Sequence, residues 1–488
     1  MQKLNRSSYP ESKTYPERVL QYGEGNFLRG FVDWQIQVLN RVAEFNGSAV
    51  VIQPRGFDKI ERLNRQEGLY TLFLQGMKEG RPVNEYQVIE SISRGINLFT
   101  DYDEYVKLAG SKDLRFIVSN TTEAGIAFHP EDRLEDRPQK SFPAKLTAFL
   151  YHRFHAFSGD VDRGCIIIPC ELIENNGEVL KEIILKYAKL WNLGDEFIGW
   201  IHQANTFCSS LVDRIVPGYP SDTIEEKTRE LGYIDELMVV GEQYHLWVIQ
   251  GPQSLYDELP VKDTGLNTLI VDDLTPYRTR KVRILNGAHT AMTPVAYLSN
   301  LETVEEAVID PEVGIFIKEM ITEEIIPTLE GEHHELSLYA DEVLNRFANP
   351  YIKHYLMSIS LNSSSKFQTR NIPTLLDYLN NKHELPKRLV FSLSALIYFY
   401  RGKRGEEPIK LQDQVGTLQF FYDLWKRYDM QVISIHQLTE AVLSNDQLWG
   451  MDLASIPNLI DKIANNLSQI EENGVRNVLK ELNEKVGM

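Results

Sequence analysis

A lysine, an asparagine and a histidine lie close together in the segment 280–289, as Lys281, Asn286 and His289. On an α-helix that turns about 100° per residue, these three positions fall within one half of the helix surface. A proton-carrying amine, a neutral amide and an imidazole can therefore face one cavity. This combination predicts proton transfer at a hydroxyl or carbonyl group without a metal ion.

A glycine-containing turn is the second candidate for chemistry, because Gly23 and Gly25 separate a strand-like run at 18–22 from a helical run at 31–45. Glycine lets the backbone approach a pyrophosphate, and the amides at the start of a helix bind it. A tight turn without a ligand is the alternative. Arg29 has the reach to contact a phosphate. The candidate cofactor-binding residues of this turn are Gly23, Gly25, Asn26, Phe27 and Arg29.

The end of the second strand-like run, 49–53, bears on the choice of coenzyme. A site for NAD typically has Asp or Glu there to accept hydrogen bonds from the ribose hydroxyls, and this chain has Gln53. Arg55 either favours the 2′-phosphate of NADP or points to solvent. These residues alone leave the coenzyme open.

Polar residues also follow two later strand-like runs, 115–119 and 165–169. Ligands of open α/β sheets collect at the carboxyl edge of the sheet, where such residues lie. The predicted contacts to cofactor or substrate are Asn120, Thr121, Thr122, Glu123 and Asn176. A turn followed by a helix N-cap is the alternative for the first group, and an asparagine–glycine turn is the alternative for Asn176.

The elements that must position these residues divide the chain into two parts. Strand-like and helical runs alternate up to about residue 275, which is typical of parallel strands covered on both faces. The runs 69–74 and 244–250 are expected to be further strands in a mixed extension of the sheet. Nearly all later runs are helical. We therefore predict an α/β domain with a mostly parallel sheet over 1–278 and an all-α domain over 279–488.

The bulk composition excludes several classes of protein. The net charge of −18 over 488 residues argues against a nucleic-acid or anionic-membrane partner. We find no apolar run of membrane-spanning length and no apolar signal core at the start. The three cysteines have neither metal-ligand nor disulfide-framework spacing. The sequence thus predicts a cytoplasmic protein without a bound metal.

These segments, in this order, resemble the polyol-specific long-chain dehydrogenases, the mannitol dehydrogenase family. The pattern Lys281-x4-Asn286-x2-His289 is that family's signature. The similarity extends over most of the chain, from Tyr22 to His354. It implies an N-terminal Rossmann-type domain and a C-terminal helical domain.

The resemblance also implies a role for each matching side chain. Lys281 matches the catalytic acid/base, and His289 matches the group that binds a substrate hydroxyl. Asn176 and Asn286 match a pair of carbonyl-polarising amides, although Glu171-Leu172 replaces the Asp-Asn that mannitol dehydrogenases have before Asn176. Asp213 matches an acid near the substrate; an ion pair with the adjacent Arg214 is the alternative.

Within the family, the sequence is most similar to the branch that reduces tagaturonate to altronate, which implies NAD (as NADH) rather than NADP. Reduction of fructuronate and oxidation of mannitol are the alternatives, because sequence pattern does not resolve the stereochemistry at one carbon. A regulator that senses the dinucleotide without turnover is an alternative of a different class. The expected partner is a small sugar acid, and the oligomeric state is left open between a monomer and a small homo-oligomer.

A sugar acid carries a carboxylate that a plain polyol lacks, so its pocket needs a matching cation. The helical half offers Arg346, Lys353, His354, Lys366 and Arg370 as candidates. We select Arg346 first, because a guanidinium binds a carboxylate through two parallel hydrogen bonds, with Lys353 and Lys366 as further ligands. Surface salt bridges are the alternative for each of them.

Overall fold

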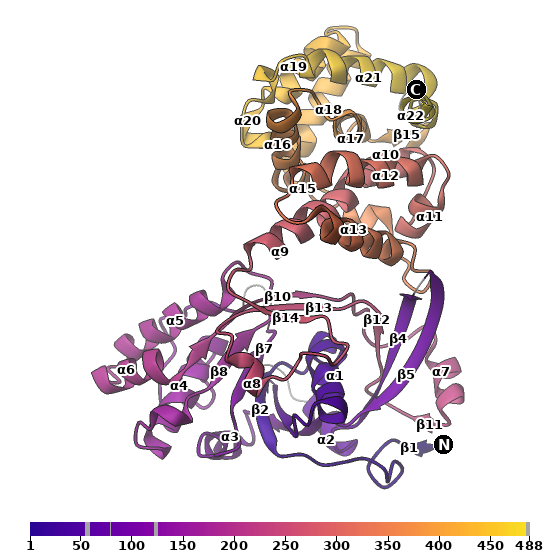
Figure 1. Cartoon of the computed structure of the whole chain (residues 1–488). Coiled ribbons are helices and arrows are strands. Elements are labelled where there is room, and N and C mark those ends of the chain that lie inside the picture. Colours follow the sequence, from indigo (N-terminus) through magenta and orange to yellow (C-terminus); the bar gives the residue numbers. More distant parts are fainter. Residues whose placement is uncertain (54–58, 79, 122–124, 485–488) are drawn as a thin grey trace. The chain divides into compact units, whose positions relative to one another are not determined.

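The computed structural model describes residues 1–53, 59–78, 80–121 and 125–484 (Figure 1). Three predicted site residues, Arg55, Thr122 and Glu123, lie outside the described residues. The chain forms two units, one made of residues 1–76 and 83–274 and the other of residues 77–82 and 275–488. The division that we predicted at 278/279 falls inside helix α9, Thr275–Arg280.

The first unit is built on a six-stranded sheet in which every strand pairs in parallel with its neighbours. Its strands are β2 (Glu17–Tyr22), β3 (Ser48–Gln53), β6 (Ile92–Asn97), β7 (Phe116–Ser119), β8 (Ile166–Pro169) and β9 (Thr206–Phe207). They lie in the order β6-β3-β2-β7-β8-β9. Numbered along the chain this is 3-2-1-4-5-6, the doubly wound order of a Rossmann domain. The predicted α/β architecture is therefore confirmed.

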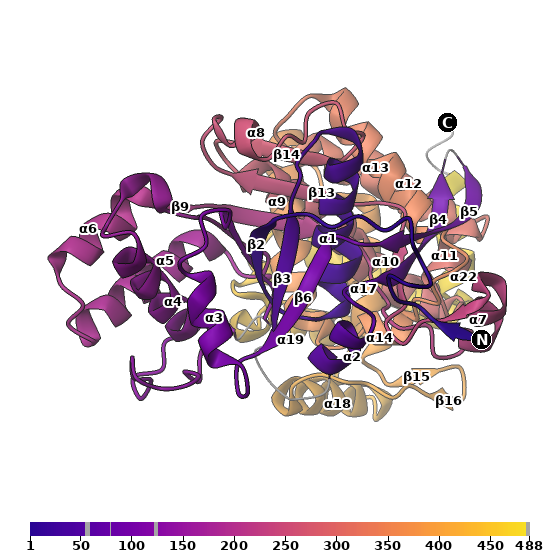
Figure 2. The ribbon, with the colours of Figure 1, turned by 90° about the horizontal axis from the view of Figure 1, so that it is seen from below.

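Side-chain alternation explains why both faces of this sheet are covered. Leu20, Val50 and Ile117 belong to the buried cluster that packs on helices α4 (Phe142–Ala156) and α5 (Asn176–Leu190). The intervening residues Val19, Ala49 and Phe116 belong to the cluster that packs on α1 (Asn26–Val42). Figure 2 shows α4 and α5 on one side of β2 and β3 and α1 on the other. Because both faces of these strands are buried, their sequences are nearly continuous runs of aliphatic residues.

Two smaller sheets correct the predicted extension of the main sheet. The run at 69–74 became β4 (Tyr70–Lys78), which lies between β12 (Val239–Glu242) and β5 (Arg81–Ile89). The run at 244–250 became β13 (Leu246–Gln250), which lies between β10 (Ser209–Asp213) and β14 (Thr268–Val271). Trp247 and Ile249 of β13 pack in the same cluster as α1. The strand therefore covers that helix and does not add to the edge of the six-stranded sheet.

The remaining elements of the first unit are short. They are β1 (Gln2–Lys3), α2 (Lys59–Arg65), α3 (Tyr102–Leu108), the 3-10 helix Val161–Arg163, α6 (Asp195–Ala204), α7 (Ile224–Leu231), β11 (Tyr233–Ile234) and α8 (Leu255–Glu258).

From Thr275 onward the described part of the second unit is helical, as predicted, apart from the small hairpin of β15 (Lys403–Arg404) and β16 (Glu407–Pro408). Its first helical stretch runs from α9 through a π-helix, Lys281–Gly287, into α10 (Ala288–Leu298). The later helices are α11 (Val304–Ile309), α12 (Val313–Glu319), the π-helix Met320–Ile325, the 3-10 helix Ile326–Thr328, α13 (His333–Phe347), α14 (Leu356–Ile359), α15 (Ser363–Arg370), α16 (Ile372–Lys382), α17 (Lys387–Phe399), α18 (Val415–Asp429), α19 (Ile435–Leu443), α20 (Asp446–Trp449), the 3-10 helix Leu453–Ser455, α21 (Leu459–Asn473) and α22 (Val475–Glu484). Over the described ranges, none of these helices combines the length and the apolar character needed to cross a bilayer.

Candidate active site

The turn between β2 and α1 lies at the point where the strand order of the main sheet reverses, between β2 and β7. Gly23 has φ of 129°, and a Cβ added there would lie 2.9 Å from the backbone oxygen of Asn120. Gly25 begins α1 without a side-chain cap, and a Cβ added there would meet no described heavy atom within 4 Å. A pyrophosphate can therefore approach the backbone closely at Gly25 and meet the first amides of α1. The residues present fit a dinucleotide at this turn.

Arg29 stabilises the turn from inside. Its guanidinium donates to the backbone oxygen of Glu24 at 3.3 Å, to Asn26 Oδ1 at 2.7 Å and to the backbone oxygen of Leu237. Phe27 stacks on Phe31 with ring centroids 5.0 Å apart. Arg29 thus has a structural role in this structure, and its contact with a phosphate stays a prediction.

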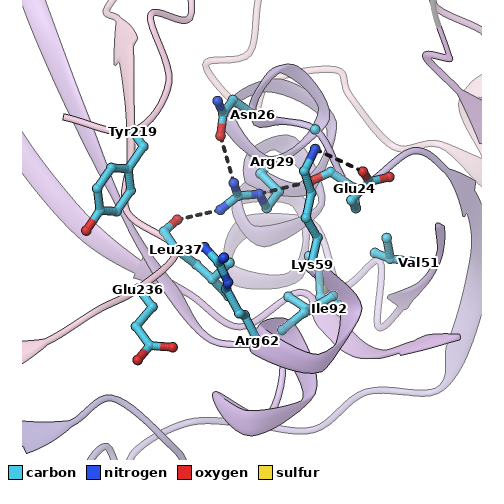
Figure 3. Close-up of a pocket in the computed structure, with 12 residues that line it drawn as sticks. Glu24, Asn26, Arg29, Val51, Lys59, Arg62, Ile92, Tyr219, Glu236 and Leu237 are labelled. Carbon is cyan, nitrogen blue, oxygen red and sulfur yellow. Dashed lines mark hydrogen bonds and ion pairs between the residues drawn. The ribbon is translucent and has the colours of Figure 1, made fainter. Parts of the chain in front are cut away.

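A cavity of about 310 Å³ opens beside this turn (Figure 3). It lies between the start of α1 and α2, and segments near β11 and β12 complete its wall. Its lining residues are Glu24, Gly25, Asn26, Arg29, Val51, Lys59, Arg62, Leu63, Ile92, Tyr219, Glu236 and Leu237. This volume is at the lower end of the range for small-molecule sites.

A buried carboxylate to which the sequence analysis gave no role, that of Glu171, joins the ends of β7 and β8. Glu171, two residues after the end of β8, accepts hydrogen bonds from the backbone N–H and hydroxyl of Thr121, both at 3.0 Å, and from the hydroxyl of Ser119 at 3.0 Å. Burial raises the pKa of Glu171. Asn120 donates to the backbone oxygen of Cys170 at 2.8 Å. Asn120 and Thr121 are therefore fixed at the carboxyl edge of the sheet, and their contact with a cofactor stays a prediction. An acidic residue two positions after an aliphatic strand was the available signal.

Asn176 does not have the geometry that we predicted. It is fully buried, and its amide nitrogen donates to the backbone oxygens of Pro169, Glu171 and Ser210 at 3.0–3.1 Å. Its Oδ1 accepts from the Ser210 backbone N–H at 2.8 Å. An amide has only two N–H groups, so these contacts leave none for a substrate oxygen. We therefore correct the prediction: Asn176 joins the start of α5 to β8 and β10.

Asp213 is buried at the end of β10, opposite Leu246 of β13. Its neighbour Arg214 donates to the backbone oxygens of Glu242 and Gly30, both at 2.8 Å, and lies over the ring of Trp34. Arg214 therefore has structural partners of its own. The substrate role of Asp213 stays a prediction.

The segment with Lys281, Asn286 and His289 is not the plain α-helix that we expected. Lys281–Gly287 forms a π-helix, and His289 lies in the first turn of α10. In a π-helix the residues five apart are joined by the hydrogen-bond pattern, so they lie one wide turn apart near the same face. An α-helix would set Lys281 and Asn286 about 140° apart. The π-helix therefore places the Lys281 amine and the Asn286 amide more nearly on the same side of the helix than an α-helix would.

Helices α15 and α16 hold this π-helix in place. Asn371 donates to the backbone oxygen of Gly287 at 3.0 Å. Arg283 donates to Thr374 Oγ1 at 2.8 Å and to Asp377 Oδ2 at 3.0 Å. In the part of the chain that the structure describes, the side-chain amide of Asn286 has no hydrogen-bond partner and is half-buried. Unlike Asn176, it keeps its donors for a ligand.

His289 is 9% exposed, and its ring stacks on Phe347 at 4.2 Å between centroids. The ring of His354 meets it edge-on at 5.1 Å. His289 Nε2 is buried and has no hydrogen-bond partner among the described residues. A buried polar atom without a partner is costly, which fits an atom kept for a substrate hydroxyl.

A cluster of cations surrounds this histidine. It comprises Arg346 at the end of α13 and Lys366 and Arg370 on α15. The pKa of His289 lies well below its ordinary value, first because of burial and then because of the positive charges of His354, Arg346, Arg370 and Lys366. The imidazole is therefore neutral at physiological pH.

Lys366 and Arg370 lie four residues apart on one helix face, where like charges repel. Lys366 donates to the Ile359 backbone oxygen at 2.9 Å, and Arg370 donates to Thr290 Oγ1 at 3.1 Å. Burial lowers the pKa of both groups. An anionic ligand would offset this repulsion. The structure therefore brings Arg370, which we had not selected, into the cluster together with Arg346 and Lys366, while Lys353 is exposed on the preceding loop.

The family models match the two halves of the chain separately. The model described as the mannitol dehydrogenase Rossmann domain matches residues 17–263, and the model for the mannitol dehydrogenase C-terminal domain matches residues 273–471. The chain belongs to the mannitol dehydrogenase family.

Curated relatives of this mannitol dehydrogenase family member match along its full length. The altronate oxidoreductase of Bacillus subtilis (strain 168) is 60% identical over 481 residues, which cover 99% of this chain and 98% of the relative. An altronate oxidoreductase of Escherichia coli is 47% identical over 483 residues, which cover 99% of this chain and all of the relative.

Solved structures with the same fold are more distant in sequence. Mannitol 2-dehydrogenase of Pseudomonas fluorescens, in a ternary complex with NAD and D-mannitol, has a TM-score of 0.68 at 21% identity and covers 99% of this chain and 100% of that one. A substrate-free D-sorbitol dehydrogenase has a TM-score of 0.78 at 20% identity, with 98% and 100% covered. These two structures support the fold alone.

This mannitol dehydrogenase family member is an oxidoreductase that acts on a CH–OH group of a polyol or sugar acid. Its Rossmann domain indicates a nicotinamide dinucleotide as the redox partner. The alternative of a sensor without turnover is not supported.

Proposed function

We propose that the protein catalyses the reversible reduction of tagaturonate to altronate with NADH. The observation that carries this proposal is the cluster of Arg346, Lys366 and Arg370 around the buried, neutral His289. A polyol has no charge for these cations to bind, whereas a sugar acid has a carboxylate. The similarity to altronate oxidoreductases over the full chain points to the same substrate class.

Carboxylate binding follows from the chemistry of this cluster. Guanidinium groups donate two parallel, charge-assisted hydrogen bonds to a carboxylate, and these are stronger than hydrogen bonds between neutral groups. Arg346 is our first choice for this contact because it is 8% exposed and raises the positive potential at His289 most among the three. Arg370 and Lys366 supply further positive charge from α15.

Proton transfer is assigned to the π-helix and the start of α10. When it is bound, the reduced dinucleotide supplies a hydride to the ketone carbon. The Lys281 ammonium gives a proton to the alkoxide oxygen, and the Asn286 amide donates a hydrogen bond to that oxygen as negative charge develops. His289 Nε2 binds a neighbouring hydroxyl. In the oxidative direction Lys281 must be neutral to accept the proton, so we expect its pKa to lie below about 10.4.

The choice of NADH over NADPH is part of the proposal. Gln53 stands at the position where an acid ordinarily accepts hydrogen bonds from the ribose hydroxyls of NAD, and Arg55 lies outside the described residues. The choice therefore needs a direct measurement.

The test is oxidation of NADH with tagaturonate, fructuronate and fructose as separate substrates. We expect the highest kcat/KM with tagaturonate and a far lower value with fructose, which lacks the carboxylate. A higher kcat/KM with fructuronate would replace the substrate by its stereoisomer. Preference for fructose would remove the role of the cations, and no turnover with any of the three would overturn the proposal.

A further inference from the structure

Gln53 occupies the position at the end of the second Rossmann strand where an acid usually binds the ribose, but here it has a structural role. Gln53 ends β3 and is 1% exposed. Its Oε1 accepts a hydrogen bond from the backbone N–H of Ile60 at 3.1 Å, in the first turn of α2. Gln53 thus holds α2 against the sheet, and it carries no charge. A ribose diol bound near this turn needs a different acceptor.

Glu24 offers a carboxylate at the same place. It lies between the two glycines of the turn and lines the cavity beside α1. Its side chain is 14% exposed, and Oε1 lies 3.2 Å from Nζ of Lys59, the first residue of α2. Figure 3 shows Glu24 and Val51 on one side of this cavity and Tyr219 and Glu236 on the other.

The second carboxylate among the described lining residues has its own partners. Glu236 pairs with Lys3 at 2.8 Å and with Arg65 at 3.3 Å. Among the residues that the structure describes, Glu24 pairs with one lysine, Lys59, whose side chain is 60% exposed. A ribose hydroxyl can therefore compete for the Glu24 oxygens at a lower cost than for those of Glu236.

The rest of the cavity wall suits a nucleoside. Val51, Leu63, Ile92 and Leu237 provide apolar contacts, and Tyr219 provides an aromatic ring at the edge. Purine bases bind to apolar and aromatic surfaces of this kind, with a few polar groups that fix their orientation.

We propose that Glu24 is the residue that determines coenzyme specificity: its carboxylate accepts hydrogen bonds from the adenosine ribose diol of NADH and repels the 2′-phosphate of NADPH. This inference rests on the proposed function, because it assumes that the dinucleotide binds at the glycine turn. Lys59 and Arg62 line the same cavity. When the negative charge of Glu24 is removed, it no longer offsets the positive charge of Lys59, which can then attract the 2′-phosphate.

The experiment measures dissociation constants of NADH and NADPH by isothermal titration calorimetry on the full-length protein. Wild type is expected to bind NADH more tightly. Glu24→Gln is expected to weaken the binding of NADH and to strengthen the binding of NADPH. The ratio of the two dissociation constants should change by about tenfold or more, because one hydrogen bond to a charged group contributes at least that factor to binding. Glu61→Gln is the matched control, because it removes the same charge from α2 at a side chain that is 72% exposed and outside the cavity.

A second variant keeps the inference testable if Glu24→Gln does not fold, as judged by circular dichroism. Lys59→Ala leaves the Glu24 carboxylate without its lysine and is expected to disfavour NADPH further while NADH still binds. A gain of NADPH binding in Lys59→Ala would overturn the role of Glu24.

The remaining outcomes separate this inference from the proposed function. A folded Glu24→Gln with an unchanged ratio of constants would overturn the inference and leave the reductase intact. A wild-type preference for NADPH would overturn the inference and the choice of NADH, but not sugar-acid reduction. Binding of neither dinucleotide would overturn the inference together with the proposed function.

Discussion

At the scale of single residues, burial decides what each polar group of the site does. Asn176 and Asn286 are the same residue type, and the resemblance to the family predicts for both the polarisation of the substrate carbonyl. Asn176 is fully buried and donates to three backbone oxygens, whereas Asn286 is half-buried and its side-chain amide has no hydrogen-bond partner among the described residues. His289 is neutral because it is buried among cations. Residue type alone would have given the two asparagines one role.

Replacement of Lys281 by alanine tests the acid/base. We expect kcat to fall by at least about 100-fold, because a positioned acid or base typically contributes that much or more. The dissociation constant of NADH should stay near the wild-type value, since Lys281 acts on the sugar. Steady-state kinetics and NADH titration check both expectations. A variant that kept more than about a tenth of the wild-type kcat would mean that another group supplies the proton.

Replacement of Arg346 by alanine tests the carboxylate contact. KM for tagaturonate should rise by about tenfold or more, since hydrogen bonds to charged groups contribute about 1.5–3 kcal/mol. KM for fructose should change little, because fructose has no carboxylate. Arg427→Ala on α18 is the control, since Arg427 is an exposed arginine of the same unit outside the cluster. Equal rises for both sugars would argue against a carboxylate role.

At the scale of elements, β2 and α1 are joined by a buried polar contact beneath the glycine turn. Gln21 of β2 donates to the backbone oxygen of Gly23 at 3.1 Å and to Asp33 Oδ2 of α1 at 3.2 Å. Asp33 Oδ1 and Gln21 Oε1 are buried without a partner among the described residues. Burial raises the pKa of Asp33 from 3.8 to about 7. A protonated Asp33 carries a donor that an ionised one lacks.

The pH dependence of stability follows from this raised pKa. Below about pH 4 the Asp33 carboxyl is protonated in both states, and between about 4 and 7 it ionises only in the unfolded chain. The native state then binds more protons, so wild-type stability should fall as the pH rises through this range, by at most about 1.4 kcal/mol per unit from this group. Asp33→Asn should remove that part of the slope. Urea unfolding at several pH values measures it, and parallel curves for the two proteins would refute the assignment.

At the scale of the whole molecule, the residues of the proposed site are divided between the two units. The Rossmann unit carries the glycine turn at its strand reversal, and the helical unit carries Lys281, Asn286 and His289 with the cation cluster. In the function that we propose, the Lys281 ammonium is the proton donor and the Asn286 amide binds the oxyanion, so this scheme needs no Lewis acid.

Removal of metals tests this scheme on the whole enzyme. Over the described residues, no three His, Cys, Asp or Glu side chains are grouped to hold a metal ion. We expect kcat to be unchanged after exhaustive dialysis against EDTA, with an assay before and after treatment as the measurement. A loss of activity that added Zn²⁺ or Mn²⁺ restores would show a metal requirement.

The sequence by itself determined the α/β and helical halves, because continuous aliphatic runs and helical periodicity are local properties of the chain. It also indicated the family, because Lys281, Asn286 and His289 lie within one short segment and their spacing is visible in the sequence. Only the tertiary structure decided that the side-chain amide of Asn176 has no N–H left for a ligand and that Lys281–Gly287 is a π-helix. It alone gathered Arg346 and Arg370 around His289 from separate helices. Hydrogen-bond partners, burial and electrostatic potential depend on residues far apart in the sequence, and these are set when the chain packs.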